Sequence, residues 1–220
     1  MRSRTAWRHA PGTSTSTVLL RHGQTAMSVE KRYSGLSDVP LTETGLRQAA
    51  AAAKALAGAG ISTIVSSPLR RAVQTAEEVA AVTGVGVITD EGFRETDFGA
   101  WEGLTFAEVR ERWPAELTTW LADPAVPPPG GESFAAVSER VTAALHRVLQ
   151  DRVLQDTEPQ TILIVSHVTP IKTLVASALL APPPALFRMH LDLAALCEID
   201  WYADGPAVLR SFNDTAHLDE

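Results

Sequence analysis

The sequence is short of several residue types and patterns, and each scarcity excludes a class of protein. The 220 residues contain a single cysteine, Cys197, so a secreted scaffold stabilised by internal disulfides is excluded. No apolar run reaches the roughly 18 residues that span a bilayer, and the first residues lack the apolar core of a secretory signal. Basic residues are also in deficit, because 19 Lys and Arg stand against 26 Asp and Glu. The lack of a disulfide framework leads us to expect a cytoplasmic protein. At a net charge of −7 we expect no broad surface for nucleic acid or membrane.

The remaining composition is that of a globular protein. Hydrophobic residues make up 45% of the chain and charged residues 20%, which is enough apolar material for a sizeable core in one domain. Residues 1–16 are rich in Ser, Thr and Arg, and we interpret them as a disordered leader or a linker remnant. Residues 17–220 are expected to form a single domain. Cys197 lies in an apolar stretch and is predicted to be buried, not catalytic.

Apolar periodicity predicts an α/β fold. Short apolar runs at residues 18–20, 61–65 and 161–165 are typical of buried strands, and strands are also expected near 85–88, 195–202 and 207–212. Helical spacing follows at 46–56, 69–80, 134–148 and 171–180, with Thr42 as one N-cap and Ser67–Pro68 as another helix start. Pro and Gly make 123–133 a loop. The alternation predicts a three-layer sandwich, with a mostly parallel central sheet flanked by helices.

Two predicted strands end in histidine, at His22 and His167. Ligands of α/β sheets gather at the carboxyl ends of the strands, so neighbouring strands would bring both imidazoles into one crevice. Arg21 precedes His22, and Arg71 lies in the first turn of the helix expected to begin at Ser67. Guanidinium groups can bind phosphate oxygens in bidentate fashion, and a helix N-terminus favours an anion. Each residue alone has a plainer reading, as a structural histidine or a solvated arginine, but together they suit phosphoryl transfer.

Six segments in a fixed order carry a resemblance. They are residues 20–25 (LRHGQT), 41–49 (LTETGLRQA), 66–76 (SSPLRRAVQTA), 93–103 (FRETDFGAWEG), 129–133 (PGGES) and 165–167 (VSH). This set resembles the histidine phosphatase, or phosphoglycerate mutase-like, superfamily over about residues 17–215. The resemblance implies a phosphoglycerate mutase-like fold and a phosphomonoesterase of the histidine acid phosphatase type.

The resemblance also implies roles for individual residues. His22 would be the nucleophile that becomes phosphohistidine, and Arg21, Arg71 and His167 would surround the phosphoryl group. Glu95 would protonate the leaving group and later activate water.

Two positions depart from the family pattern. Ser28 stands where the family often has Asn, and its shorter hydroxyl is still expected to contact phosphate. Val168 replaces a frequent Gly and leaves a backbone N–H for the same purpose. No Cys/His cluster has zinc spacing and no phosphate-binding GxxxxGK[ST] loop occurs, so we expect neither a metal nor a cofactor.

The reaction and substrate stay open among several hypotheses. Only residues 96–128 separate Glu95 from the PGG segment, and such a short lid favours hydrolysis of a small-molecule phosphate ester. Residues 166–173, 190–194 and 212–215 are similar to the phosphatase half of proteins that fuse a ribonuclease H domain to an acid or α-ribazole phosphatase. That similarity suggests α-ribazole 5′-phosphate or a broad range of esters as substrate, and an upstream ribonuclease H domain in a longer parent protein. The alternatives are a cofactor-dependent phosphoglycerate mutase and a non-catalytic module that binds a phosphate ligand on the same fold.

Overall fold

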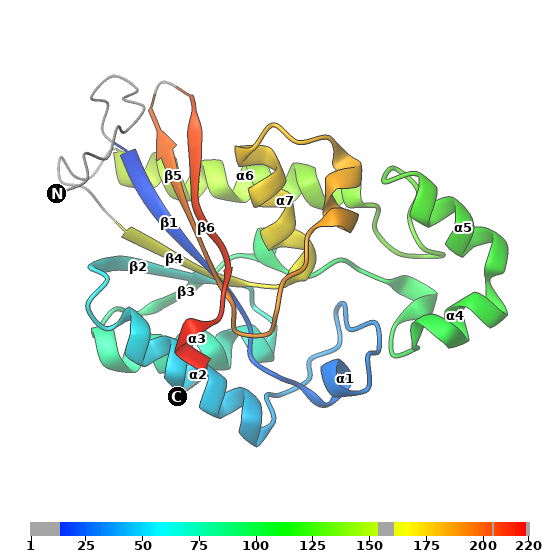
Figure 1. The fold of residues 1–220 in the computed structure, drawn as a ribbon, viewed down its shortest axis with the longest axis horizontal. Coiled ribbons are helices and arrows are strands. Elements are labelled where there is room, and N and C mark those ends of the chain that lie inside the picture. Colours follow the sequence, from blue (N-terminus) through cyan, green and yellow to red (C-terminus); the bar gives the residue numbers. More distant parts are fainter. Residues whose placement is uncertain (1–13, 154–160, 204, 219–220) are drawn as a thin grey trace, which may run out of the picture.

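The computed structural model describes residues 14–153, 161–203 and 205–218. Within them, six strands form one sheet in the order β3-β2-β4-β1-β5-β6 (Figure 1). The strands are β1 Ser14–Arg21, β2 Ile61–Ser66, β3 Val87–Thr89, β4 Thr161–Ser166, β5 Leu196–Tyr202 and β6 Ala207–Asp214. The helices are α1 Ala26–Val29, α2 Glu43–Leu56, α3 Arg70–Thr83, α4 Phe106–Arg112, α5 Pro114–Ala122, α6 Phe134–Val153 and α7 Val168–Ala178.

The sheet is mostly parallel, as the sequence predicts. β1 pairs in parallel with β4, β4 with β2 and β2 with β3, while β5 is antiparallel to both β1 and β6. Arg21 at the end of β1 pairs with Ser166 at the end of β4. Because the two strands are neighbours in this register, the residues that follow them, His22 and His167, leave the sheet at the same edge.

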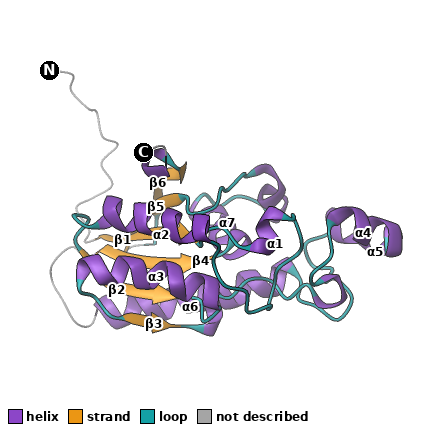
Figure 2. Ribbon diagram, turned by 90° about the horizontal axis from the view of Figure 1, so that it is seen from below, coloured by secondary structure: helices purple, strands orange, loops and turns teal. Residues whose placement is uncertain are grey.

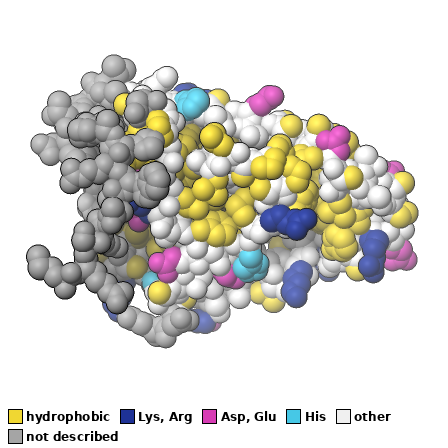
Figure 3. All heavy atoms as spheres, turned by 45° about the horizontal axis from the view of Figure 1, so that its top comes forward, with side chains coloured by type: hydrophobic (Ala, Val, Ile, Leu, Met, Phe, Trp, Pro, Cys, Tyr) yellow, Lys and Arg dark blue, Asp and Glu magenta, His cyan; other side chains and the backbone are white. Residues whose placement is uncertain are grey.

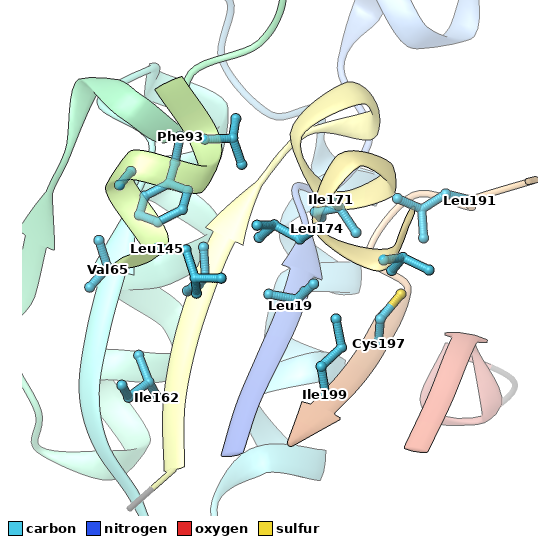
Figure 4. Close-up of a cluster of buried hydrophobic side chains, with 14 of the residues drawn as sticks. Leu19, Val65, Phe93, Leu145, Ile162, Ile171, Leu174, Leu191, Cys197 and Ile199 are labelled. Carbon is cyan, nitrogen blue, oxygen red and sulfur yellow. The ribbon is translucent and has the colours of Figure 1, made fainter. Parts of the chain in front are cut away.

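Helices cover both faces of the sheet, which gives the predicted three layers. α2 and α3 lie on one face and α6 and α7 on the other (Figure 2). Successive strand residues point to opposite faces. Leu20 therefore packs in the cluster beneath α2 and α3, whereas Leu19 belongs to the cluster beneath α6 and α7. Figure 4 shows the second cluster, in which Cys197 is buried. Cys197 is buried, as predicted, and burial raises the pKa of its thiol to about 11.

The start of β1 corrects the boundary of the predicted leader. The polar composition places residues 14–16 in the leader, yet they belong to β1, where Ser14 pairs with Tyr202 and Ser16 with Thr161. Sheet pairing overrides the polar composition because it satisfies the backbone N–H and C=O groups of these residues. Residues 1–13 lie outside the described residues.

One predicted helix start is confirmed and the other is wrong. Thr42 is the N-cap of α2, since its Oγ1 accepts a 3.1 Å hydrogen bond from the Gly45 N–H. α3, however, begins at Arg70 with Leu69 as its cap, not at Ser67–Pro68. The Ser67 hydroxyl instead lies 2.7 Å from His167 Nε2. Arg71 nevertheless remains in the first turn of α3.

Residues 96–128 hold two short helices that the sequence analysis missed, α4 and α5. They extend from the carboxyl edge of the sheet (Figure 1) and pack through an apolar cluster that includes Trp101, Val109 and Trp120. A capping box at Thr105 and Glu108 starts α4, and Pro114 is the first residue of α5. The segment is therefore a packed, aromatic lid.

No helix among the described residues is long and apolar enough to cross a membrane. Apolar side chains do gather on the face shown in Figure 3, where single charged side chains interrupt them.

Candidate active site

A cavity of about 320 Å³ opens at the carboxyl ends of β1 and β4. Its polar side is formed by Arg21, His22, Thr25, Ser28, Arg32, Ser34, Glu95, Thr169 and Lys172, together with Val168. Its other side is aromatic and aliphatic, with Tyr33, Phe98, Trp120, Phe134, Leu186 and Phe187. A charged group can thus bind next to the sheet while the rest of a ligand contacts the lid.

His22 is held in one tautomer by its own turn. Its Nδ1 lies 2.8 Å from the Gly23 carbonyl oxygen, which can only accept, so Nδ1 carries the proton. The lone pair is then on Nε2. Burial, together with the charges of Arg71 and Arg21, holds the pKa of His22 well below its usual value of 6.5. The imidazole is therefore neutral and has a free nucleophilic nitrogen at neutral pH.

His167 lies beside His22, with the ring centroids 5.0 Å apart. The two strand-end histidines are therefore neighbours, but only His22 lines the cavity, because the His167 side chain is fully buried behind it. His167 Nε2 is 2.7 Å from Ser67 Oγ, and its buried Nδ1 has no hydrogen-bond partner within the described residues. Burial and the nearby Arg71 lower the pKa of His167 well below 6.5 as well.

Arg21 brings a charge to the cavity wall. Its Nη1 donates a 2.6 Å hydrogen bond to the Leu191 carbonyl oxygen, and its buried Nε has no partner within the part of the chain described. Burial lowers the pKa of Arg21 to about 10, while Glu95 and Asp192 oppose that shift. The guanidinium therefore stays protonated at neutral pH.

Arg71 is arranged differently from the expected bidentate ligand. It is fully buried, and its Nη1 donates to the Ser37 carbonyl oxygen while Nη2 donates to those of Ser34 and Gly35, at 2.7 to 3.1 Å. Both hydrogens of Nη2 are thereby engaged, and Nε remains without a partner among the described residues. Arg71 thus supports the site chiefly by its charge and by fixing residues 34–37.

Glu95 faces the cavity, and its backbone carbonyl is held by Arg140, which is itself paired with Glu132. Its Oε1 accepts a 2.8 Å hydrogen bond from the Thr96 N–H. Arg140 donates to the Glu95 carbonyl oxygen at 3.0 Å and forms a two-pronged ion pair with Glu132, at 2.7 and 2.8 Å. The PGGES segment thus acts through Glu132, which orients the arginine that holds Glu95.

Ser28 and Val168, the two positions that depart from the family pattern, both line the cavity. The Ser28 hydroxyl, however, donates its single hydrogen to the Thr25 carbonyl oxygen at 2.8 Å and accepts from the Thr25 N–H at 3.0 Å. It can donate to a ligand only by giving up the bond to Thr25. Val168 is the first residue of α7, where backbone N–H groups are available to an anion.

Lys172 is a cavity residue that the sequence analysis missed. It is half-buried, and burial together with Arg21 lowers its pKa. No carboxylate of the described residues forms an ion pair with it. The sequence signal was present, because Lys172 follows Val168 by four residues and so lies on the same face of α7.

The two buried histidines make stability depend on pH. Between their lowered pKa values and the ordinary 6.5, the unfolded chain binds protons that the folded chain does not. The free energy of unfolding should therefore fall as pH drops below 6.5, by up to about 1.4 kcal/mol per pH unit for each histidine. Urea unfolding between about pH 7 and pH 5 measures this slope.

His167→Asn is the test variant, because His167 is buried. His146→Asn is the matched control, because His146 is exposed on α6. The first should flatten the slope by about one proton and the second should leave it unchanged. An unchanged slope in His167→Asn would mean that His167 is protonated in the folded state.

In the described residues, no group of three or more His, Cys, Asp or Glu side chains is placed to hold a metal ion.

Comparison with known proteins places this geometry in a family. The model of the histidine phosphatase superfamily (branch 1) matches residues 17–215. The Mycobacterium tuberculosis protein named bifunctional protein Rv2228c is 49% identical over 96% of this chain, which spans only 57% of that relative's length. The probable phosphoglycerate mutase GpmB of Cronobacter sakazakii is 37% identical, with 91% of this chain and 94% of the relative covered.

Among solved structures, mycobacterial glucosyl-3-phosphoglycerate phosphatase Rv2419c is similar in fold. It is 31% identical with a TM-score of 0.83, and the match covers 92% of this chain and all of that one. Residues 17–215, which the family model matches, contain both histidines, both arginines and Glu95. The chain belongs to the histidine phosphatase superfamily, branch 1.

Proposed function

We propose that this chain hydrolyses small-molecule phosphate monoesters through a phosphohistidine formed on His22. The observation that carries the proposal is the tautomer of His22. The Gly23 carbonyl fixes the proton on Nδ1 and leaves Nε2 free, beside Arg21 and Glu95 in the same cavity. A nucleophile, a cation for the phosphate oxygens and a proton donor are the parts that the reaction needs.

In the first step, His22 Nε2 attacks phosphorus as the bond from phosphorus to the ester oxygen breaks. Glu95 in its protonated form gives its proton to that oxygen, so the alcohol leaves neutral. Arg21, the charge of Arg71 and the N-terminus of α7 at Val168 offset the charge on the equatorial oxygens, and the neutral His167 lies beside His22.

In the second step, water attacks the phosphohistidine. Glu95, now a carboxylate, accepts a proton from the water, and the bond between Nε2 and phosphorus breaks to release inorganic phosphate. His22 returns to its neutral form and Glu95 is protonated again, so the cycle closes without a co-reactant.

The finer substrate hypotheses rest on resemblance. α-Ribazole 5′-phosphate suits an aromatic wall that includes Phe98, Trp120 and Phe187, whereas a broad acid phosphatase would accept many esters at the same wall. The structural neighbour Rv2419c is a glucosyl-3-phosphoglycerate phosphatase, which makes carboxylated esters a third class to assay. An upstream ribonuclease H domain in a longer protein stays a prediction.

A mutase is the second candidate, because GpmB is named a probable phosphoglycerate mutase. The two reactions differ in what accepts the phosphoryl group from His22. We expect 3-phosphoglycerate, supplied with 2,3-bisphosphoglycerate, to yield inorganic phosphate and no 2-phosphoglycerate. Isomerisation faster than phosphate release would favour the mutase.

Metal chelation and vanadate test the charge balance of the proposed site. Arginine charge and a helix terminus take the place that Mg²⁺ holds in other phosphoryl-transfer enzymes. Hydrolysis of p-nitrophenyl phosphate should therefore persist in EDTA, and orthovanadate should inhibit because it can bind as a trigonal bipyramid on His22. Activity that is lost on chelation and restored by added metal would contradict the proposed site. No hydrolysis of any ester, with vanadate still bound, would favour the non-catalytic binding module.

A further inference from the structure

Two sequence segments, 190–194 (HLDLA) and 212–215 (FNDT), have no part in the mechanism described so far. The structure joins them through Asp192 and Asn213. The Asp192 N–H donates to Asn213 Oδ1 at 2.6 Å, and Asn213 Nδ2 donates to Asp192 Oδ2 at 2.8 Å. We call this pair of hydrogen bonds the clasp. It fastens the loop before β5 to the end of β6.

The residues next to the clasp hold Arg21 from two sides. The Leu191 carbonyl oxygen accepts the 2.6 Å hydrogen bond from Arg21 Nη1, and the Ala195 carbonyl oxygen accepts from the Arg21 backbone N–H at 3.1 Å. The Ala194 N–H donates to the His22 carbonyl oxygen at 3.2 Å. The loop that the clasp fastens thus contacts both Arg21 and His22.

The backbone conformation of Asn213 also supports a specific role for the clasp. Asn213 has φ of 56° inside β6, a left-handed conformation that Asn tolerates better than most residues. This conformation coincides with a shift of the β5–β6 register, in which Leu196 pairs with Asp214 and Glu198 with Ser211. The local departure from regular pairing is where the Asn213 side chain meets Asp192.

A purely electrostatic role for Asp192 is the weaker explanation. Its charge does raise the pKa of Arg21. The Asp192 side chain, however, is 48% exposed, so solvent screens its charge. The geometric effect is direct, since Asp192 adjoins Leu191, whose side chain is buried and whose carbonyl receives the Arg21 hydrogen bond.

We infer that the clasp of Asp192 and Asn213 is a positioning device for Arg21. It fixes the Leu191 carbonyl, which takes one guanidinium hydrogen and so aims the remaining donors of Arg21 at the phosphoryl group. This inference rests on the proposed function, which places Arg21 against phosphate. Asp192 and Asn213 are positioning residues that do not themselves contact the ligand.

The first test is Asn213→Gly, which removes the clasp and retains freedom for positive φ. We expect the inhibition constant of vanadate and the KM for p-nitrophenyl phosphate to rise about tenfold, in line with a misplaced charged hydrogen bond. Asp192→Ala removes only the clasp bond from Asn213 Nδ2, should raise both constants in the same direction by a smaller factor, and serves as the second variant if the first fails to fold. Asp192→Asn retains an acceptor for Asn213 and should stay near the wild type. An Asp192→Asn variant as impaired as Asp192→Ala would overturn the geometric role.

Two further comparisons separate positioning from mere stability. Arg210→Gln breaks the 2.6 Å ion pair with Asp200 on the same two strands, and it should lower Tm without changing vanadate affinity. In an Arg21→Ala background, Asn213→Gly should cause no additional loss of vanadate affinity, because its effect runs through Arg21. Multiplicative losses in the double variant would overturn the inference.

Calorimetric titration measures the affinity for vanadate in the wild type and in Asn213→Gly, and so tests the role of the clasp even if the chain turns over no ester. A chain whose vanadate affinity falls in Asn213→Gly but which hydrolyses no ester would refute the proposed function and leave the positioning role of the clasp intact. A chain that hydrolyses esters with the same vanadate affinity in Asn213→Gly would refute the clasp alone.

Discussion

Replacing His22 with alanine is expected to reduce turnover of phosphate esters by on the order of 10⁴-fold or more, because the covalent route disappears. The loss should appear in kcat for every ester, including p-nitrophenyl phosphate, since no leaving group can compensate for a missing nucleophile. Steady-state kinetics measure it, and equilibrium binding of vanadate checks that the cavity persists.

The matched control is His146→Ala, because His146 is a histidine exposed on α6, away from the cavity. Its kcat should equal that of the wild type. A His22→Ala variant that keeps more than a tenth of the wild-type kcat would show that another group attacks phosphorus.

Replacing Glu95 with glutamine is expected to separate substrates by their leaving groups. Gln retains an oxygen that can accept from the Thr96 N–H, but it cannot give up a proton to the ester oxygen. Alkyl phosphates, whose alkoxides need that proton, should lose roughly 10²- to 10⁴-fold in the phosphorylation rate. p-Nitrophenyl phosphate should lose far less in this step, because nitrophenolate leaves without a proton.

Single-turnover kinetics are required, since the second step still needs a base for water and slows both substrates. Glu132→Gln provides a control, because it weakens the support of Glu95 through Arg140 without removing the acid. It should slow both substrates by a similar, smaller factor. Equal losses of the phosphorylation rate on both esters in Glu95→Gln would remove Glu95 from the proton-donor role.

Local sequence signals predicted local structure well. The Thr42 cap of α2 depends on a hydroxyl and an N–H three residues away, so the sequence contains all of it. Ser67 shows the opposite case. Its hydroxyl meets His167, 100 residues further on, and a distant partner of this kind cannot be inferred from a capping pattern.

The missed helices α4 and α5 have the same physical origin. They are short, and their Val109 and Leu117 belong to one apolar cluster with Phe134 and Leu186, which lie outside the lid segment. Tertiary packing, more than a long apolar stripe, stabilises helices of this length. The sequence therefore indicated where the lid segment lies, but not that it folds into two helices.

The site was predictable where it follows from the sheet. His22 and His167 end adjacent parallel strands, so their meeting required only the strand order. The environment of Arg71 was not predictable, because it depends on the carbonyl groups of residues 34–37, which no side-chain pattern marks. The contact between Asp192 and Asn213 was not predictable either, because the two residues lie in separate sequence motifs and nothing in either motif indicates that they meet.

The central claim is that the phosphoryl group passes through His22 Nε2. The most direct measurement is rapid quenching in alkali during turnover of a ³²P-labelled ester, followed by peptide mapping of the acid-labile phosphate. The account predicts label on the peptide that contains His22, bound at Nε2, with none in the His22→Ala variant and an undiminished amount in His146→Ala. Label on His167 or on any other residue, or turnover with no labelled protein at any quench time, would contradict it.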